Sequence, residues 1–252
     1  MLFDSIVYGP IHSRRLGISL GMEIMPLEHK LCTFNCVYCE CGWNTPVSHP
    51  KLPTREEIKA ALEAKLQNMT TPLDVITFSG NGEPTLHPDF LGIIQDTCAL
   101  RDRYCPNAKV SVLSNSTQLG RPEVVQALKL CDNRILKLDA ATDEMMRRID
   151  LPVYEHLTVE TLLHWLAQFD GDFTLQTCFL KGTHQGVILD NTAGKELTAW
   201  YEAVDFLHPK QIMIYVIDRK TPEENLEKIP RAEMEAIAAP LIAKGFDVSI
   251  SA

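Results

Sequence analysis

Short apolar segments alternate with helical segments along most of this chain. It has 252 residues, 45% of them hydrophobic, which is enough for one sizeable core. Alternating strands and helices are typical of βα units repeated around a parallel sheet. We therefore expect an α/β fold, formed as a single domain over residues 1–252, since α/β barrels of this length commonly form one domain.

The expected elements follow from apolar periodicity and from helix start and stop signals. The expected strands are residues 17–25, 74–79, 109–113, 135–139, 173–180, 211–217 and 246–250. The expected helices are residues 54–66, 88–103, 122–130, 143–149, 155–169, 196–207 and 231–244. Thr54 and Glu57 have the spacing of a capping box at the start of the first helix. Residues 181–191 carry two glycines, and we expect an irregular lid or substrate loop there.

Three cysteines lie in one short run, directly after the first expected strand. Cys32, Cys36 and Cys39 have the spacing C-x3-C-x2-C. A cubane iron–sulfur cluster normally takes four cysteine thiolates. A cluster held by three therefore keeps one iron open to another ligand.

Other uses of the cysteines stay open at this point. Cys41 follows closely and completes a set of four for a structural zinc site, although such sites usually consist of two separated pairs. A disulfide framework is disfavoured, because 8 cysteines in 252 residues do not make a small secreted scaffold. The remaining cysteines lie in apolar, periodic surroundings typical of buried inert thiols; they are Cys98, Cys105, Cys131 and Cys178.

The charge balance bears on partners and compartment. There are 24 basic and 33 acidic residues, a formal charge of −9, which disfavours unassisted binding to nucleic acid. Arg14 and Arg15, with His12, form one candidate local basic patch. The chain begins without a secretion signal, and no stretch is long and apolar enough to span a membrane. We expect a cytoplasmic protein without a membrane anchor, where thiols stay reduced.

The cysteine spacing, with Tyr38 directly before Cys39, resembles that of the radical S-adenosylmethionine (SAM) superfamily. The resemblance implies a 4Fe-4S cluster whose open iron chelates SAM. One electron from the cluster then cleaves SAM to methionine and a 5′-deoxyadenosyl radical, which abstracts hydrogen from a substrate. It also implies a partial (β/α)6 barrel, with its active site at the carboxyl ends of the strands, and a one-electron donor such as flavodoxin or ferredoxin.

Polar and glycine-rich segments follow two of the expected strands. The run Gly80-Asn81-Gly82-Glu83-Pro84 resembles the superfamily's Gly-Gly-Glu-Pro motif, with Asn81 in place of one glycine. The resemblance implies that Gly82, Glu83 and Pro84 bind the SAM amino group. Glycines also let a backbone approach a ligand closely. Ser114 and Asn115 end the next strand and can bind the SAM carboxylate or ribose, or serve only as turn residues.

Lys137 and Asp139 lie two residues apart on an expected strand and so share one face. They form either a simple ion pair or, as the resemblance implies, contacts from Lys137 to the SAM carboxylate and from Asp139 to the ribose hydroxyls. Gln176 can add hydrogen bonds or satisfy a buried polar group. Relatives place the aromatic at the position of Tyr38 beside the adenine. Val216 or Ile217 can supply an apolar wall there, and core packing explains these two aliphatics equally well.

A closer resemblance extends over about the whole chain. It is to the iron–sulfur oxidoreductases grouped with the wyosine base-formation enzymes, which modify tRNA. The segments that carry it are Tyr8-Gly9-Pro10, Ser13–Gly17, Ser19-Leu20-Gly21, the cysteine run, Lys137–Ala141, Ile149–Pro152 and Ile217-Asp218-Arg219.

The wyosine enzymes carry further N-terminal cysteines for a second cluster, whereas no cysteine precedes Cys32 here. The acidic balance also lacks the electrostatic footprint of a tRNA-binding protein. We therefore carry over cluster and SAM binding, and keep wyosine-type modification as an alternative. An activase that installs a glycyl radical on a partner protein and a non-catalytic cluster or zinc protein are further alternatives. Arg14 and Arg15 either bind a carboxylate or phosphate of the substrate or hold an N-terminal arm in place.

Overall fold

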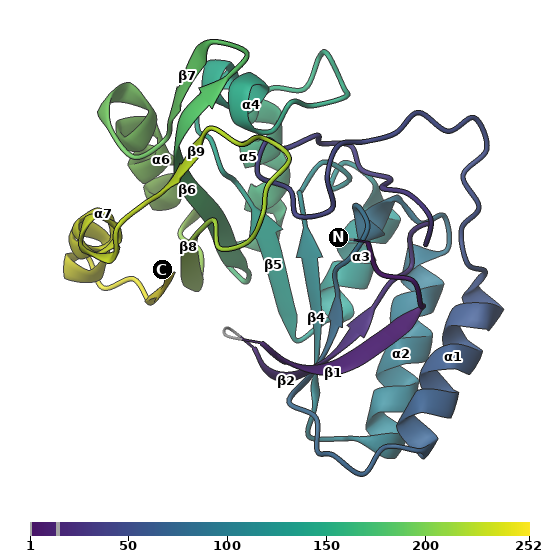
Figure 1. Ribbon diagram of the computed structural model, residues 1–252. Coiled ribbons are helices and arrows are strands. Elements are labelled where there is room, and N and C mark those ends of the chain that lie inside the picture. The colour runs from purple at the N-terminus through teal and green to yellow at the C-terminus, as the bar shows by residue number, and fades with distance from the viewer. Residues whose placement is uncertain (1, 14–15) are drawn as a thin grey trace. The chain divides into compact units, whose positions relative to one another are not determined.

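The computed structural model describes residues 2–13 and 16–252 (Figure 1). It consists of two compact units. The first unit is formed by residues up to Cys32 together with Asn44–Ile135, and the second by Thr33–Trp43 together with Leu136–Ala252. The cysteine run therefore contributes Cys32 to the first unit and Cys36 and Cys39 to the second.

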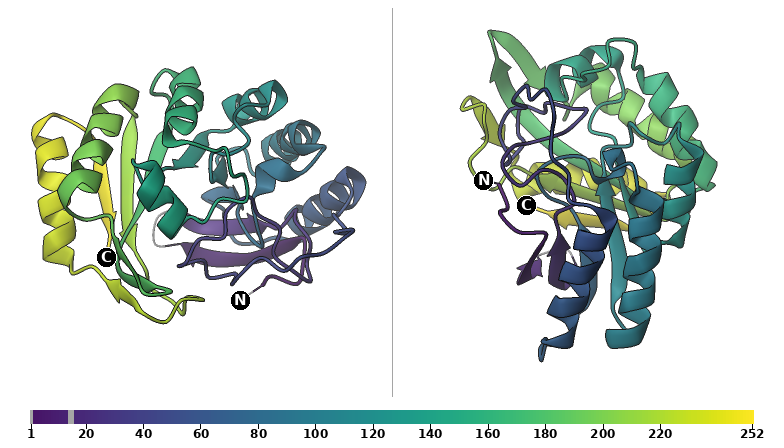
Figure 2. Two further views of the ribbon diagram at one scale, coloured as in Figure 1. Left: turned by 90° about the horizontal axis from the view of Figure 1, so that it is seen from above. Right: turned by 90° about the vertical axis from the view of Figure 1, so that its right-hand side faces the viewer.

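The first unit is a mostly parallel sheet with helices along one face. Strand β1 (Val7–Ser13) pairs antiparallel with β2 (Gly17–Met22), and β2, β3 (Val75–Phe78) and β4 (Lys109–Ser114) are parallel neighbours. Figures 1 and 2 show three helices side by side along this unit. They are α1 (Arg55–Gln67), α2 (Phe90–Tyr104) and α3 (Pro122–Leu130). A short 3-10 helix, η1 (Pro84–Leu86), follows the glycine turn.

The second unit repeats the α/β pattern. Strand β5 (Asn133–Lys137) begins in the first unit and ends in the second. Strands β6 (Thr174–His184), β8 (Gln211–Val216) and β10 (Val248–Ser251) are parallel neighbours, while β7 (Val187–Asp190) and β9 (Leu226–Lys228) pair antiparallel with the end of β6. The helical elements are α4 (Asp143–Ile149), α5 (Val159–Leu166), η2 (Ala167–Phe169), α6 (Gly194–Leu207) and α7 (Arg231–Ala243).

Most expected elements are present, which confirms the α/β class. The capping box of α1 forms as predicted: Glu57 N donates to Thr54 Oγ1 (3.2 Å) and Thr54 N donates to the Glu57 carboxylate (2.8 Å). Helices α3 and α4 have the predicted bounds. Local signals sufficed here, because caps and prolines act on neighbouring residues.

Three expectations for the elements were wrong. Residues 181–191 are not an irregular loop: β6 continues to His184 and returns as β7, through a two-residue turn in which Gln185 and Gly186 have φ of 50° and 79°. Positive φ at both central residues is typical of tight hairpin turns. Strand β1 precedes the strand that we took as the first, and β9 was not predicted. Strand β1 pairs with β2, its neighbour in sequence, whereas the three-residue β9 is defined by its pairing with the distant β6, which local pattern does not show.

The core of the second unit includes part of the cysteine run. Val37, between two cysteines, is fully buried in a cluster with Ile149, Cys178, Leu180 and Leu189. Tyr38 and Ile217 pack against the same cluster. Burying an aliphatic side chain of this size stabilises by about 2 kcal/mol, so the run is anchored by its apolar residues as well as by hydrogen bonds.

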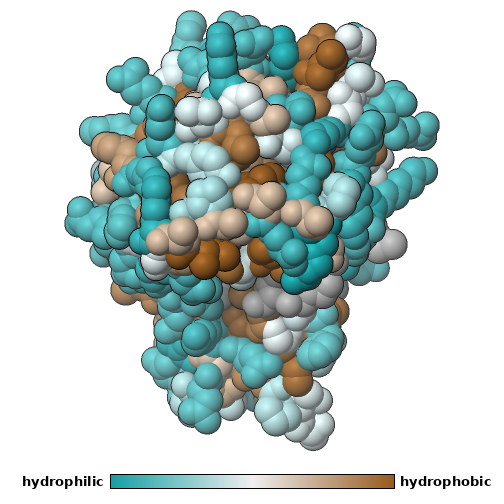
Figure 3. Space-filling model, turned by 90° about the vertical axis from the view of Figure 1, so that its left-hand side faces the viewer, coloured by the Kyte–Doolittle hydropathy of each residue, from teal (hydrophilic) through white to brown (hydrophobic). Residues whose placement is uncertain are grey.

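Hydrophilic side chains predominate on the face shown in Figure 3, with hydrophobic ones interspersed among them. Some large apolar side chains are exposed, such as Ile188 on β7 and Phe206 on α6. Within the described part of the chain, no helix is both long and apolar enough to cross a membrane.

Candidate functional site

The glycine turn after β3 lies against the segment that leads into the cysteine run. Leu31 N donates to Asn81 O (2.9 Å), and Glu83 N donates to Leu31 O (3.0 Å). A Cβ added at Gly82 would overlap Leu31 O and lie 2.6 Å from its carbonyl carbon. Because those atoms are backbone, position 82 requires glycine for this close approach. The turn therefore holds the chain one residue before Cys32.

The Glu83 side chain joins this turn to the end of β4. Its carboxylate accepts hydrogen bonds from Thr85 N (3.1 Å), Thr85 Oγ1 (2.5 Å), Ser114 Oγ (2.8 Å) and Asn115 N (2.6 Å). Burial raises the pKa of Glu83, and these hydrogen bonds oppose the rise. The carboxylate thus points at donors of its own chain. The SAM contacts predicted for Gly80, Asn81, Gly82, Glu83, Pro84, Ser114 and Asn115 stay predictions.

Asn115 also reaches the first cysteine of the motif. Its Nδ2 lies 3.4 Å from Cys32 Sγ, while its Oδ1 accepts from Thr117 N (3.0 Å) and Thr117 Oγ1 (2.8 Å). Those two bonds fix the amide so that its NH2 group faces the sulfur. An N–H group directed at a thiolate is a common way of tuning a metal-binding sulfur.

Asn81, where the resemblance expects a glycine, has a structural role. Its side chain is fully buried. Its Nδ2 donates to Phe3 O (2.8 Å) and Pro26 O (3.1 Å), and its Oδ1 accepts from Phe3 N (2.8 Å). The departure from the motif therefore ties the N-terminal segment and the residues after β2 to the turn.

The cysteine run of the second unit is held like a strand against residues 149–152. Val37 N donates to Ile149 O (2.9 Å) and Asn35 N donates to Asp150 O (2.9 Å). Phe34 and Pro152 form an isolated bridge of the antiparallel type. The Ile149–Pro152 segment, one of those that carry the family resemblance, therefore supports the backbone of the cysteine run.

A buried ionic network surrounds Cys36. The Lys137 ammonium lies 2.6 Å from the Asp150 carboxylate, 3.1 Å from that of Asp139 and 2.9 Å from Cys36 Sγ. It also lies 4.8 Å from the ring centroid of Phe34. Burial lowers the pKa of Lys137, but its neighbours, first Asp139 and then Asp150, raise it more, to well above its ordinary value. Burial raises the pKa of Asp150 to about 7, with Lys137 acting against the rise.

Asp139 links this network to Tyr38. The Tyr38 hydroxyl donates to one oxygen of Asp139, and Cys178 N donates to the other (2.8 Å). Tyr215 stands edge-on to Tyr38, with ring centroids 6.4 Å apart. Burial and the charge of Asp139 raise the pKa of Tyr38 well above its ordinary value. The ion pair expected of Lys137 and Asp139 is therefore present, while their contacts with SAM and that of Tyr38 with adenine stay predictions.

Gln176, Val216 and Ile217 pack within the second unit, and the SAM contacts predicted for them stay predictions. Gln176 is buried in β6, with its Nε2 3.5 Å from Met213 Sδ, and its backbone carbonyl accepts from Leu138 N (3.0 Å). Val216 is buried at the end of β8, and Ile217 packs against the core of the second unit. Arg14 and Arg15 lie outside the described residues.

Sequence reasoning missed several polar groups. Glu23 is a buried carboxylate directly after β2. Asp150 was part of a recognised segment but was given no role. His184 pairs with Glu223 (Nδ1 to carboxylate, 2.7 Å), and its ring lies 5.6 Å from that of Trp43. A carboxylate inside an apolar stretch was the available signal for Glu23, whereas the partners of the others are distant in sequence.

The donor chemistry of the motif cysteines suits an iron–sulfur cluster. Among residues 2–13 and 16–252, no three His, Cys, Asp or Glu side chains form a group that could hold a metal ion. Soft thiolates are nevertheless the usual ligands of such a cluster. Cys32 faces the Asn115 amide and Cys36 faces the Lys137 ammonium, and both contacts stabilise negative charge on sulfur.

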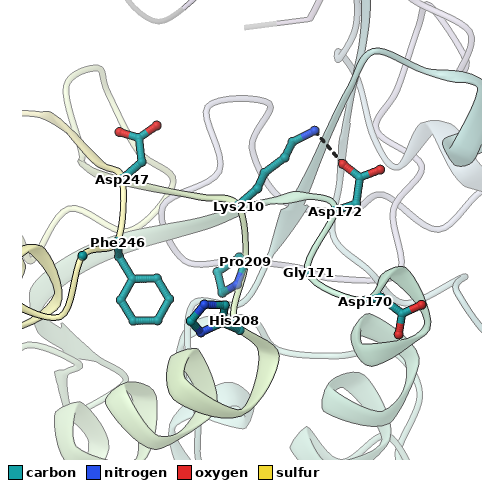
Figure 4. A pocket seen from close by; sticks show the side chains of 9 residues that line it. Asp170, Gly171, Asp172, His208, Pro209, Lys210, Phe246 and Asp247 are labelled. Atoms are coloured by element: carbon teal, nitrogen blue, oxygen red, sulfur yellow. Dashed lines mark hydrogen bonds and ion pairs between the residues drawn. The ribbon is translucent and has the colours of Figure 1, made fainter.

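A surface pocket of the second unit lies elsewhere. It has a volume of about 450 Å³ and is lined by the loops that precede β6, β8 and β10 (Figure 4). Lys210 and Asp172 form a partly exposed ion pair across it, 2.9 Å apart. In parallel βα architectures catalytic residues gather at the carboxyl ends of the strands. This pocket lies at the amino ends, so we do not assign the reaction to it.

Two known proteins are similar to this chain over most of its length. A 33% identical UPF0026 protein of Helicobacter pylori aligns over 97% of this chain and 76% of its own length. A region of the GTPase Obg of Brachyspira hyodysenteriae is 31% identical over 91% of this chain, but that is only 32% of the GTPase.

Two solved structures show the same fold, a partial barrel of the α/β class. The structure of Streptococcus suis SuiB bound to S-adenosylmethionine has a TM-score of 0.63 at 13% identity and covers 91% of this chain and 49% of SuiB. The structure of TYW1 with a lysine-pyruvate adduct bound also has a TM-score of 0.63, at 17% identity, and covers 89% of this chain and 73% of TYW1. The family model for the radical SAM superfamily matches residues 29–183. The chain therefore belongs to the radical SAM superfamily.

Proposed function

We propose that this protein is an enzyme that reductively cleaves SAM at a 4Fe-4S cluster held by Cys32, Cys36 and Cys39, and directs the resulting radical to a substrate. One observation carries the proposal. The superfamily match over residues 29–183 contains the three cysteines, the glycine turn and Lys137 together. A zinc site or inert thiols would not require these features in one chain.

The cysteines, the residues that contact their sulfurs and the glycine turn have different roles in the proposed reaction. The three thiolates hold the cluster, which when bound supplies the electron that cleaves SAM to methionine and a 5′-deoxyadenosyl radical. Asn115 and Lys137 direct N–H groups at Cys32 and Cys36 and so stabilise the ligand sulfurs. The turn at Gly82 keeps its backbone close to the cysteine run and presents carbonyl groups to the SAM ammonium.

The reaction needs one electron for each cleavage. We assign its supply to a small donor such as flavodoxin or ferredoxin, and place the protein in the cytoplasm, where thiols remain reduced. We do not propose nucleic acid as the substrate, because the formal charge of −9 opposes binding to phosphates.

Anaerobic reconstitution with iron and sulfide tests the proposal. The wild-type protein should take up about four irons per chain and, after reduction with dithionite, should convert SAM to 5′-deoxyadenosine. The Cys36→Ala variant should lose both iron and cleavage. Cys98→Ala is the matched control, because Cys98 lies on α2 outside the motif, and it should keep both.

The proposal fails if reduced, reconstituted protein releases no 5′-deoxyadenosine, or if Cys36→Ala keeps wild-type iron content and cleavage. Stoichiometric zinc in the protein as purified, with no iron uptake, would instead support a structural metal site. Co-purification with a large partner that gains a glycyl radical would identify an activase.

A further inference from the structure

Glu23 is a buried carboxylate to which the proposed function assigns no role. It lies directly after β2 and is 1% exposed. Parallel pairing of β2 with β3 sets Met22 beside Phe78, so the residues that leave the two strands run side by side. Burial of a carboxylate is costly unless its oxygens are hydrogen-bonded. Its partners therefore show what the group is for.

Those partners are backbone N–H groups of two turns. One oxygen of Glu23 accepts from Met25 N (2.7 Å), and the other accepts from Asn81 N. The same residue 81 gives its carbonyl to Leu31 N (2.9 Å). A hydrogen-bonded path therefore runs from Glu23 through the turn to the residue before Cys32.

The carboxylate also determines which residue fits at position 80. A Cβ added at Gly80 would overlap the Glu23 carboxylate and lie 2.8 Å from its carboxyl carbon. Gly80 is not among the residues with positive φ, so its backbone conformation would tolerate alanine. The obstacle to a side chain at position 80 is thus Glu23. At Gly82 the obstacle is the Leu31 backbone, which cannot be shortened by mutation.

We propose that Glu23 is a positioning residue for SAM, which fixes the backbone of the Gly80–Glu83 turn at the geometry that receives the SAM ammonium. The inference rests on the proposed function and adds a residue that lies outside every motif recognised in the chain. A carboxylate suits the task because it accepts two N–H groups at once, whereas glutamine would present its NH2 group to one of them.

The test compares variants of the reconstituted holoenzyme for SAM affinity and for the saturation of 5′-deoxyadenosine release. Glu23→Gln should weaken SAM binding about ten-fold, the loss of one hydrogen bond to a charged group. It should raise KM by a similar factor and leave kcat within about two-fold, because it weakens the hold on SAM equally in the ground state and in the transition state. The control is Glu28→Gln, an exposed glutamate five residues further on, which should bind as wild type does.

A second comparison tests the contact itself. Gly80→Ala in the wild-type background should weaken SAM binding about thirty-fold or more, because the turn must move. In a Glu23→Ala background, Gly80→Ala should cost less than about three-fold, since the space of the carboxylate is then vacant. If Gly80→Ala alone does not fold, Glu23→Ala should restore a folded protein.

The outcomes separate the two proposals. Wild-type protein that holds a cluster but binds no SAM overturns the proposed function and this inference with it. Wild-type protein that binds SAM while Glu23→Gln binds it equally well overturns the inference alone. So does a Gly80→Ala loss that is the same in both backgrounds, or a fold that Glu23→Ala does not restore.

Discussion

The ammonium group of Lys137 lies 2.9 Å from the sulfur of Cys36 and also contacts two buried carboxylates, those of Asp139 and Asp150. A lysine so placed has two effects. It stabilises negative charge on a sulfur that we propose as a cluster ligand, and it is the cation that the buried carboxylates of Asp139 and Asp150 share. The second effect is measurable without any cluster.

We expect Lys137→Met to destabilise the protein by about 3 kcal/mol or more, because it leaves two carboxylates buried without their cation. The free energy of unfolding, measured by urea denaturation before reconstitution, checks this. Adding Asp150→Asn to Lys137→Met should recover more than about 1 kcal/mol of the loss, since one of the two unpaired charges is removed. Equal destabilisation in the single and double variants would show that the network contributes no electrostatic coupling.

Some residues of this network could be predicted from the sequence, and others could not. Cys36, Lys137 and Asp139 were predicted from the cysteine spacing and from a two-residue alternation, both of which are local. Asp150 bonds to Cys36 across 114 positions of the chain, and Glu23 to Asn81 across 58. Strand pairing brings such partners together. In the sequence alone, a carboxylate that will be buried cannot be distinguished from one that will be exposed to solvent.

The pH dependence of stability should report the buried state of Glu23. Burial raises its pKa from 4.5 to about 7. Between these values the folded protein keeps a proton that the unfolded chain has released. The stability that this group contributes is therefore full below its unfolded pKa and is lost as the pH rises through its folded pKa.

In the Glu23→Gln variant this titration is absent. The free energy of unfolding of wild type minus that of the variant should thus fall by up to about 3 kcal/mol between about pH 4.5 and pH 8. Denaturation of both proteins at several pH values measures the difference. A difference that stays constant, or grows with pH, would mean that Glu23 titrates with an ordinary or lowered pKa.

Replacing the Glu83 carboxylate by an amide, in Glu83→Gln, should destabilise the protein. Its carboxylate faces four donors, from Thr85, Ser114 and Asn115. In Glu83→Gln an NH2 group replaces one acceptor and opposes at least one of these donors, so we expect a loss of about 2 kcal/mol of stability. Thermal and urea unfolding measure the loss. The exposed Glu123, on α3, supplies the control variant Glu123→Gln, and comparable stability of the two variants would contradict the role given to Glu83.

The hairpin beyond the expected end of β6 shows a different limit of sequence reasoning. Glycines at 182 and 186 indicated a break, and the loop prediction followed. In the structure Gly186 supplies a tight turn, whereas Gly182 lies within the paired strand, where a Cβ would overlap Asn225 O and lie 2.9 Å from Leu226 Cα. One glycine thus forms the turn that ends β6, and the other permits close pairing of β6 with β9. Only the position of the neighbouring segment distinguishes these roles.

The two glycines provide a matched pair of variants. Both have positive φ, 144° at Gly182 and 79° at Gly186, but a Cβ at Gly186 would meet nothing within 4 Å. Gly186→Ala should therefore cost about 1 kcal/mol, from backbone strain alone. Gly182→Ala should cost about 3 kcal/mol, because steric overlap with the β9 segment adds to the strain. Hydrogen exchange should then rise at residues 225–228 in the Gly182 variant and stay unchanged in the Gly186 variant. Equal costs for the two substitutions, with no change in exchange at β9, would show that close packing against Asn225 does not hold this strand to β6.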